Sequence, residues 1–159
     1  MIRIQQEDFD VGKELKGLVR GKHGIGGLCS FVGLVRDMAD GERIGAMTLE
    51  HYPAMTEKAV EKIEADARAR WPLKASLIIH RYGTLEPGDQ IVLVITAAAH
   101  RQDAFEACHF LIDWLKTQAP FWKREETDSG PQWVAARDSD DRAAERWAQD
   151  RTDRDKVRG

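Results

Sequence analysis

A cluster of cationic and aromatic side chains is the chemically most distinctive part of this chain. Lys116 precedes the run APFWKRE at residues 119–125, and His100 and Arg101 stand upstream of both. The 159 residues carry 24 basic and 27 acidic side chains, which gives a net charge of only −3. Positive charge is therefore local, and it predicts a compact anionic substrate. A nucleic-acid-binding domain more often shows a basic balance and a long basic face.

Part of the cluster also has a simple structural explanation. Lys116 stands near the predicted end of a helix, where the helix dipole favours a cation whatever its function. Lys123 and Arg124 alternate along a predicted strand, so one side chain faces the packed side of the sheet and its neighbour faces away. An exposed strand lysine is therefore the alternative to a functional Lys123.

His100 and Arg101 fall where a strand is predicted to give way to a helix. Backbone N–H groups at a helix start favour an anion, so two cations at this position act against the helix dipole. A bound phosphate or carboxylate would explain them, and so would a local acidic partner such as Asp103. Arg36 and Arg137, each near the end of a predicted strand, carry no signal individually.

Hydrophobic periodicity predicts the mixed α and β elements that must position these side chains. Apolar residues recur every three or four positions over residues 54–71, including Met55, and over 101–118, with Phe105 among the inward side chains. This spacing indicates two amphipathic helices. Asp10 is a candidate N-cap for a shorter helix at 11–19. A further short helix is expected at 140–147.

Strands are predicted where apolar and β-branched residues form short runs between turn residues. The expected strands cover residues 2–4, 26–36, 46–51, 75–80, 90–97, 121–125 and 132–136. The turn at 40–42 predicts a hairpin between the second and third of these strands. The strands at 75–80 and 90–97 should be central in their sheet. Residues 1–148 are expected to form one domain, and the charged segment 149–159 a disordered tail.

Several common kinds of site have little support in the sequence. Cys29 and Cys108 have the apolar neighbours of core residues, no Cys-x-x-Cys pair occurs, and the histidines lack metal-ligand spacing, so no metal site is expected. The glycine-rich run at 21–27 lacks the Gly-Lys-Ser/Thr ending of a nucleotide-binding loop and precedes a strand. No leader-like or membrane-length apolar stretch occurs, so we expect a cytoplasmic protein with no membrane partner.

Six short motifs occur along the chain in a specific order. They are FVGLVR at 31–36, LEHYP at 49–53, AHR at 99–101, LKT at 115–117, APFWKRE at 119–125 and WVAAR at 133–137. With these motifs the chain resembles the large, catalytic subunit of molybdopterin synthase over roughly residues 1–148. The resemblance implies an α+β fold, an α/β hammerhead-like single domain with a small antiparallel β subdomain.

The resemblance also implies a reaction. In this family, cyclic pyranopterin monophosphate receives two sulfur atoms and becomes molybdopterin, the dithiolene ligand of the molybdenum cofactor. A small ubiquitin-like partner subunit delivers the sulfur as a thiocarboxylate on its C-terminal Gly-Gly. No cofactor is expected. Neither Cys29 nor Cys108 stands in the electropositive, partly exposed setting that activates a thiol, which agrees with sulfur arriving from the partner.

Roles in this reaction can be assigned by chemistry. Lys123 lies near a second cation and is flanked by aromatic residues, so repulsion and desolvation loosen its proton and suit it to general acid–base work. Lys116 is expected to hold the partner's terminal carboxylate and to stabilise the oxyanion. Guanidinium forks suit phosphate oxygens. The residues expected to bind the cyclic phosphate and orient the pterin are Arg36, His100, Arg101 and Arg137.

The spacing of these residues bears on assembly. Arg101 and Lys116 stand near opposite ends of one predicted helix, and fifteen residues at about 1.5 Å each separate their backbones by roughly 22 Å. One small pocket could not easily use both. We therefore expect a homodimer in which His100 and Arg101 of one subunit complete the site built on Lys116 and Lys123 of the other. In the family, large subunits dimerise and each binds one small subunit, which gives a heterotetramer.

Two other classes of function fit parts of the pattern. A non-catalytic module could dock a ubiquitin-like tail, but docking alone would not require Arg36 or Arg101. An RNA-binding domain could stack bases on Trp122 and neutralise phosphates with Lys123 and Arg124. The acidic balance of the chain argues against that function, so no nucleic-acid partner is expected.

Overall fold

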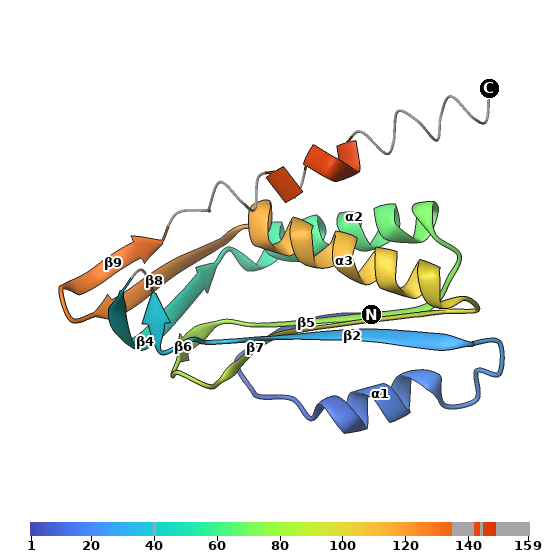
Figure 1. The fold of residues 1–159 in the computed structure, drawn as a ribbon, viewed down its shortest axis with the longest axis horizontal. Coiled ribbons are helices and arrows are strands. Elements are labelled where there is room, and N and C mark those ends of the chain that lie inside the picture. Colours follow the sequence, from blue (N-terminus) through green and yellow to red (C-terminus); the bar gives the residue numbers. More distant parts are fainter. Residues whose placement is uncertain (40, 135–141, 144, 149–159) are drawn as a thin grey trace.

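The computed structural model describes residues 1–39, 41–134, 142–143 and 145–148. In this part of the chain, two β-sheets and three long helices form an α+β fold, as the sequence predicts (Figure 1). The elements follow in the order β1 (Ile2–Gln5), α1 (Val11–Val19), β2 (Gly27–Leu34), β3 (Met38–Ala39), β4 (Glu42–His51), α2 (Pro53–Arg70), β5 (Leu73–Arg81), β6 (Gly83–Leu85), β7 (Gln90–Ala98), α3 (Arg101–Thr117), β8 (Phe121–Thr127) and β9 (Gly130–Val134). None of the helices in the described part is long and apolar enough to cross a membrane.

The first sheet has the strand order β1-β5-β7-β2, in which β1 runs parallel to β5 and the other neighbours are antiparallel. Helices α2 and α3 cover one face, and α1 covers the other (Figure 1). Successive strand side chains point to opposite faces. Ile78 therefore joins the core beneath α2 and α3, whereas Leu77 and Ile79 join the core beside α1. Burial on both faces explains the continuous apolar runs of the central strands β5 and β7.

The helix boundaries follow from local chemistry. Asp10 accepts a hydrogen bond of 2.9 Å from the backbone N–H of Lys13, which caps α1 at the predicted position. Pro53 stands in the first turn of α2, where its missing N–H costs no hydrogen bond. Helix α3 begins at Arg101 with His100 as its N-cap. The three predicted helices at 11–19, 54–71 and 101–118 are confirmed to within one residue at each end.

The second sheet lies at one end of the first and combines β3, β4, β8 and β9, with β6 also paired to β4 (Figure 1). The predicted hairpin between residues 26–36 and 46–51 is wrong. Strand β2 pairs with β7, for example Phe31 with Val94, while β4 pairs with β8 and β6. The chain between β2 and β4 crosses from one sheet to the other. Strands β2 and β4 therefore belong to different sheets.

Two apolar side chains assigned to the core by periodicity are exposed. Phe105 is 58% exposed, and Met55 is 50% exposed. The buried stripe of α3 runs through Ala104, Cys108 and Leu111, so Phe105 lies beside it rather than on it. Met55 similarly precedes the buried stripe of α2. Both predictions are wrong because the angular position of a residue on its helix, and not its apolar character alone, decides whether it faces the core.

The C-terminal predictions are tested only in part. Strand β9 ends at Val134, and residues 142–143 and 145–148 are helical, which overlaps the helix predicted at 140–147. Trp147 is buried. Arg137 and the predicted tail 149–159 lie outside the described residues.

Candidate functional site

Lys123 lies on the inner face of the second sheet. In β8 it pairs with Leu49 of β4 on one side and with Val134 of β9 on the other. Directly paired residues project to the same face, and Leu49 is fully buried in a core with Met47 and Leu85. Lys123 is half-buried. Its neighbour Trp122 projects from the other face and is 42% exposed, so the strand presents the lysine to the interior side.

A group of histidines and aromatic rings lies on this side of the sheet. The Phe121 ring stacks on His80, with centroids 3.8 Å apart, and lies 5.5 Å from the ring of His51. His51 also packs against Tyr82 at 4.6 Å and has its Nδ1 3.1 Å from Oγ1 of Thr56. Three elements meet here, because His51 ends β4, His80 lies in β5, and Phe121 begins β8. These rings line the junction of the two sheets.

The electrostatics of this junction favour neutral imidazoles. Burial lowers the pKa of His80 to about 4, and the positive charge of Lys123 acts in the same direction. Nδ1 of His80 lies 2.8 Å from the carbonyl oxygen of Arg81 and must donate to it, so the remaining nitrogen, Nε2, carries the lone pair. Burial also lowers the pKa of His51. Near neutral pH, Lys123 therefore lies beside uncharged imidazole rings.

Lys116 lies in the last turn of α3 and is exposed. Helix α3 leads through Ala119 and Pro120 directly into β8, so Lys116 and Lys123 flank the same helix-to-strand junction (Figure 1). Among the described residues, no ion pair neutralises Lys116. The two predicted catalytic lysines thus occupy one end of the molecule.

Arg36 follows β2 at this same end. Strand β2 and helix α3 run in the same direction, so the end of β2 and the end of α3 both point toward the second sheet (Figure 1). The exposed Arg36 side chain borders a shallow depression together with Met38 and Pro87. An exposed guanidinium at a depression is accessible to an anionic ligand.

His100 and Arg101 lie at the opposite end of α3, roughly 22 Å from Lys116 along the helix axis. Both side chains are exposed. Within residues 1–39 and 41–134, neither forms an ion pair with Asp103, so the simple structural explanation for these cations fails. The structure therefore does not bring His100 and Arg101 together with the lysines in one chain.

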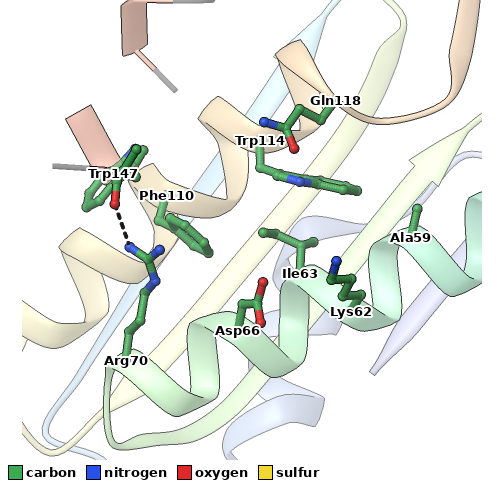
Figure 2. Close-up of a pocket in the computed structure, with 10 residues that line it drawn as sticks. Ala59, Lys62, Ile63, Asp66, Arg70, Phe110, Trp114, Gln118 and Trp147 are labelled. Carbon is green, nitrogen blue, oxygen red and sulfur yellow. Dashed lines mark hydrogen bonds between the residues drawn. The ribbon is translucent and has the colours of Figure 1, made fainter. Parts of the chain in front are cut away.

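A hollow of about 510 Å³ lies between α2 and α3 (Figure 2). Its walls include Asp66 and Arg70 from α2 and Trp114 from α3, and Trp147 closes one end. Arg70 donates a hydrogen bond of 3.3 Å to the carbonyl oxygen of Trp147. None of the predicted site residues in the described part lines this hollow. It is separate from the candidate site.

Sequence reasoning missed the ring group at the sheet junction. His51 is part of the LEHYP motif at 49–53, but His80 appears in the sequence only as the end of an apolar strand. No local spacing links them, because strand pairing between β4 and β8 brings His51 and Phe121 together. Among the described residues, no group of three or more potential ligands is arranged to hold a metal ion.

Comparisons with known proteins identify the family. The model of the MoaE protein family matches residues 4–118. A molybdopterin synthase catalytic subunit from Pseudomonas aeruginosa is 58% identical over 146 residues, covering 92% of this chain and 97% of that relative. The solved structure of the molybdopterin biosynthesis MoaE protein from Burkholderia ambifaria is 53% identical, with a TM-score of 0.80 and coverage of 93% of this chain and 97% of that one.

A more distant structure shares the fold. It is a protein–protein complex of subunits 1 and 2 of molybdopterin-converting factor from Helicobacter pylori, 24% identical, with a TM-score of 0.69 and coverage of 86% of this chain and 91% of that one. The nearer relatives decide the assignment, since identity above 50% extends over almost the whole of both chains. The chain belongs to the MoaE family of molybdopterin synthase catalytic subunits, which act in molybdenum cofactor biosynthesis.

Proposed function

We propose that this subunit transfers sulfur from the C-terminal thiocarboxylate of a small ubiquitin-like partner to cyclic pyranopterin monophosphate, with Lys123 and Lys116 as catalytic residues. The observation that carries the proposal is the position of Lys123. This half-buried lysine is presented on the inner face of β8 beside the neutral His80 ring. Partial removal from water favours proton exchange by an ammonium group.

The chemistry assigns the lysines different tasks. The thiocarboxylate sulfur attacks a carbon of the pterin side chain, a C–S bond forms, and the displaced oxygen takes up a proton, which Lys123 supplies. Water then attacks the partner's carbonyl carbon. Lys116 stabilises the resulting oxyanion as the acyl C–S bond breaks. The sulfur stays on the pterin, and the partner leaves with an ordinary carboxylate.

The remaining cations suit the phosphate of the substrate. Arg36 is exposed at the same end of the molecule as both lysines, where its guanidinium could pair with phosphate oxygens. We assign the same task to His100, Arg101 and Arg137. His100 and Arg101 would act from a second subunit, because α3 holds them far from Lys116 in their own chain.

A homodimer is supported by the open edge of the first sheet. Strand β2 is the last strand in the order β1-β5-β7-β2, and its side chains Leu28, Phe31 and Leu34 are exposed. An apolar edge strand is a natural surface for self-association. Gly27 of this strand lies against the start of α3, where an added Cβ would be 3.6 Å from the Cα of Arg101. A second copy bound along β2 would lie near His100 and Arg101.

The proposed partner is a small subunit that carries the sulfur. The Helicobacter pylori structure of the same fold contains two subunits of molybdopterin-converting factor, which supports an analogous complex here. Two large and two small subunits would then form a heterotetramer. We place this assembly in the cytoplasm.

The test is reconstitution from purified components. The protein, the thiocarboxylated small subunit and cyclic pyranopterin monophosphate should together yield dithiolene. Lys123→Ala and Lys116→Ala should each lower turnover by roughly a hundredfold or more while leaving the fold intact. Lys74→Ala, which removes an exposed strand lysine from β5, is the matched control and should keep full activity. Near-normal turnover by either site variant would remove that lysine from the mechanism, and partner binding without turnover by the wild type would indicate a docking module.

A further inference from the structure

The two cysteines of the chain lie on facing elements. Cys29 in β2 pairs directly with Thr96 in β7, so both side chains project to the same face of the first sheet. The Thr96 hydroxyl donates a hydrogen bond of 2.6 Å to the carbonyl oxygen of Ala104 in α3. Cys108 stands one helical turn beyond Ala104 and points to the same face of the helix. The helix therefore sets Cys108 above the strand that carries Cys29.

The two side chains share one part of the core. The side chain of Cys108 is buried in the layer between the first sheet and α3, where Cys29 and Thr96 are its neighbours. Cys29 is half-buried and packs against the same hydrophobic core that contains Cys108. Both are free cysteines. A disulfide requires side chains that point toward each other, and the register of Cys29 on β2 and the buried position of Cys108 on α3 direct both side chains into the same layer.

We propose that Cys29 and Cys108 are an oxidation site at which hydrogen peroxide produces an intramolecular disulfide between β2 and α3. The peroxide oxidises the Cys29 thiol to a sulfenic acid, and one water leaves. The Cys108 sulfur then attacks the sulfenic sulfur, its proton leaves with the hydroxyl group as a second water, and the S–S bond forms. A thiol-based reductant restores both thiols.

The surroundings determine the order of these steps. Cys29 is the more exposed of the two, so the oxidant meets it first. Burial raises the pKa of the Cys108 thiol, and contact with Cys29 acts in the same direction, so Cys108 stays protonated and escapes direct attack. Its proximity to Cys29 lets it trap the sulfenic acid before a second oxidation. The pair thus provides one accessible thiol and one buried thiol that resolves it.

The bond would tie together two elements that we assign to the substrate site. Strand β2 leads to Arg36, and helix α3 begins at Arg101 and ends beside Lys116. The crosslink lies in the core between them and consumes no predicted site residue. This oxidation is distinct from the sulfur-transfer chemistry, and its test does not require the partner or the pterin.

The experiment treats the folded protein with a small excess of hydrogen peroxide, then unfolds it in acid and alkylates the remaining thiols. We expect both thiols to disappear, the intact mass to fall by about 2 Da for the two hydrogens lost, and dithiothreitol to reverse the change. Cys29→Ser should leave Cys108 alkylated in full. Cys108→Ser should convert Cys29 to a sulfenic acid that dimedone traps.

Three results would overturn the proposal. Both thiols could remain available for alkylation after peroxide treatment that oxidises the same protein once it is unfolded. Cys29 could proceed to a sulfinic acid while Cys108 stays free. The disulfide could instead join two copies of the chain, visible as a dimer on a non-reducing denaturing gel.

Discussion

The ring of Phe121 lies flat on the imidazole of His80, with centroids 3.8 Å apart and an interplanar angle of 15°. Phe121 begins β8 in the second sheet, and His80 lies near the end of β5 in the first. The contact therefore fixes the two sheets relative to each other. Lys123, two residues along β8 on the same face as Phe121, takes its position from this stack.

Phe121→Ala should therefore weaken both the fold and the site. We expect the free energy of unfolding to fall by about 2 kcal/mol, below the usual cost of a fully buried phenylalanine, because Phe121 is only half-buried. Turnover per folded molecule should also fall, since Lys123 loses its support. Urea unfolding and the dithiolene assay measure the two effects. Trp122→Ala, on the opposite face, is the control, and an equal loss of activity in that variant would contradict this explanation.

The buried His80 should make stability dependent on pH. Its pKa is about 4 in the folded protein and 6.5 in the unfolded chain, so the unfolded state binds the extra proton between these values. Stability from this group is complete above pH 6.5 and is lost as the pH falls toward 4, by about 3 kcal/mol in total. Urea unfolding at a series of pH values measures the loss.

His80→Phe is the control for this pH dependence, because it keeps an aromatic ring against Phe121 but cannot bind a proton. The variant should lose less stability than the wild type between pH 6.5 and 4. Carboxylates such as Glu64, whose pKa is lowered by its hydrogen bonds and nearby positive charges, remain in both proteins and cancel in the comparison. Parallel curves for the two proteins would show that His80 is not the titrating group.

A shared active site predicts rescue between two inactive variants. Arg101→Ala and Lys123→Ala homodimers should each be defective at every site. When the two chains are co-expressed, random pairing makes half of the dimers mixed, and in a mixed dimer one site contains both defects and the other is intact. Roughly a quarter of wild-type activity should return. A verified mixed dimer no more active than its parents would contradict the cross-subunit arrangement of Arg101 and Lys123.

Delivery of sulfur by the partner predicts that both cysteines are dispensable for turnover. The double variant Cys29→Ala, Cys108→Ala should retain substantial dithiolene formation per folded molecule. It should lose about 1–3 kcal/mol of stability, because Cys108 lies in the core. A folded but inactive double variant would indicate that this chain carries the sulfur itself, as a persulfide.

The sequence predicted the elements whose signals are local. Helix α1 was predicted with its observed bounds because Asp10 supplies an N-cap immediately before it. Strands β5 and β7 were recognised as central because burial on both faces leaves a continuous apolar run. The cationic residues around α3 were found because charge beside aromatic rings is visible in one short segment.

Features that depend on distant pairing were missed. The hairpin prediction is wrong because β2 pairs with β7, more than fifty residues away, and not with the next long strand, β4. No local signal in the sequence distinguishes these two pairings. The ring group of His51, His80 and Phe121 is assembled from three strands, and none of these residues is unusual in its own segment. Helical angle, which separates Phe105 from Cys108, was resolved only by the packing of α3 on the sheet.

The distribution of tryptophans makes the intrinsic fluorescence of this protein a two-part signal. Of the five tryptophans, Trp122 and Trp133 are exposed on the second sheet, where a polar environment shifts emission to longer wavelengths. Trp71 and Trp147 are buried beside α2 and α3, with their rings 5.7 Å apart. A water-soluble quencher would reduce the fluorescence of Trp122 and Trp133 and leave that of Trp71 and Trp147 nearly unchanged. A change on ligand addition that is confined to the quenchable, long-wavelength emission therefore reports on the second sheet without a label.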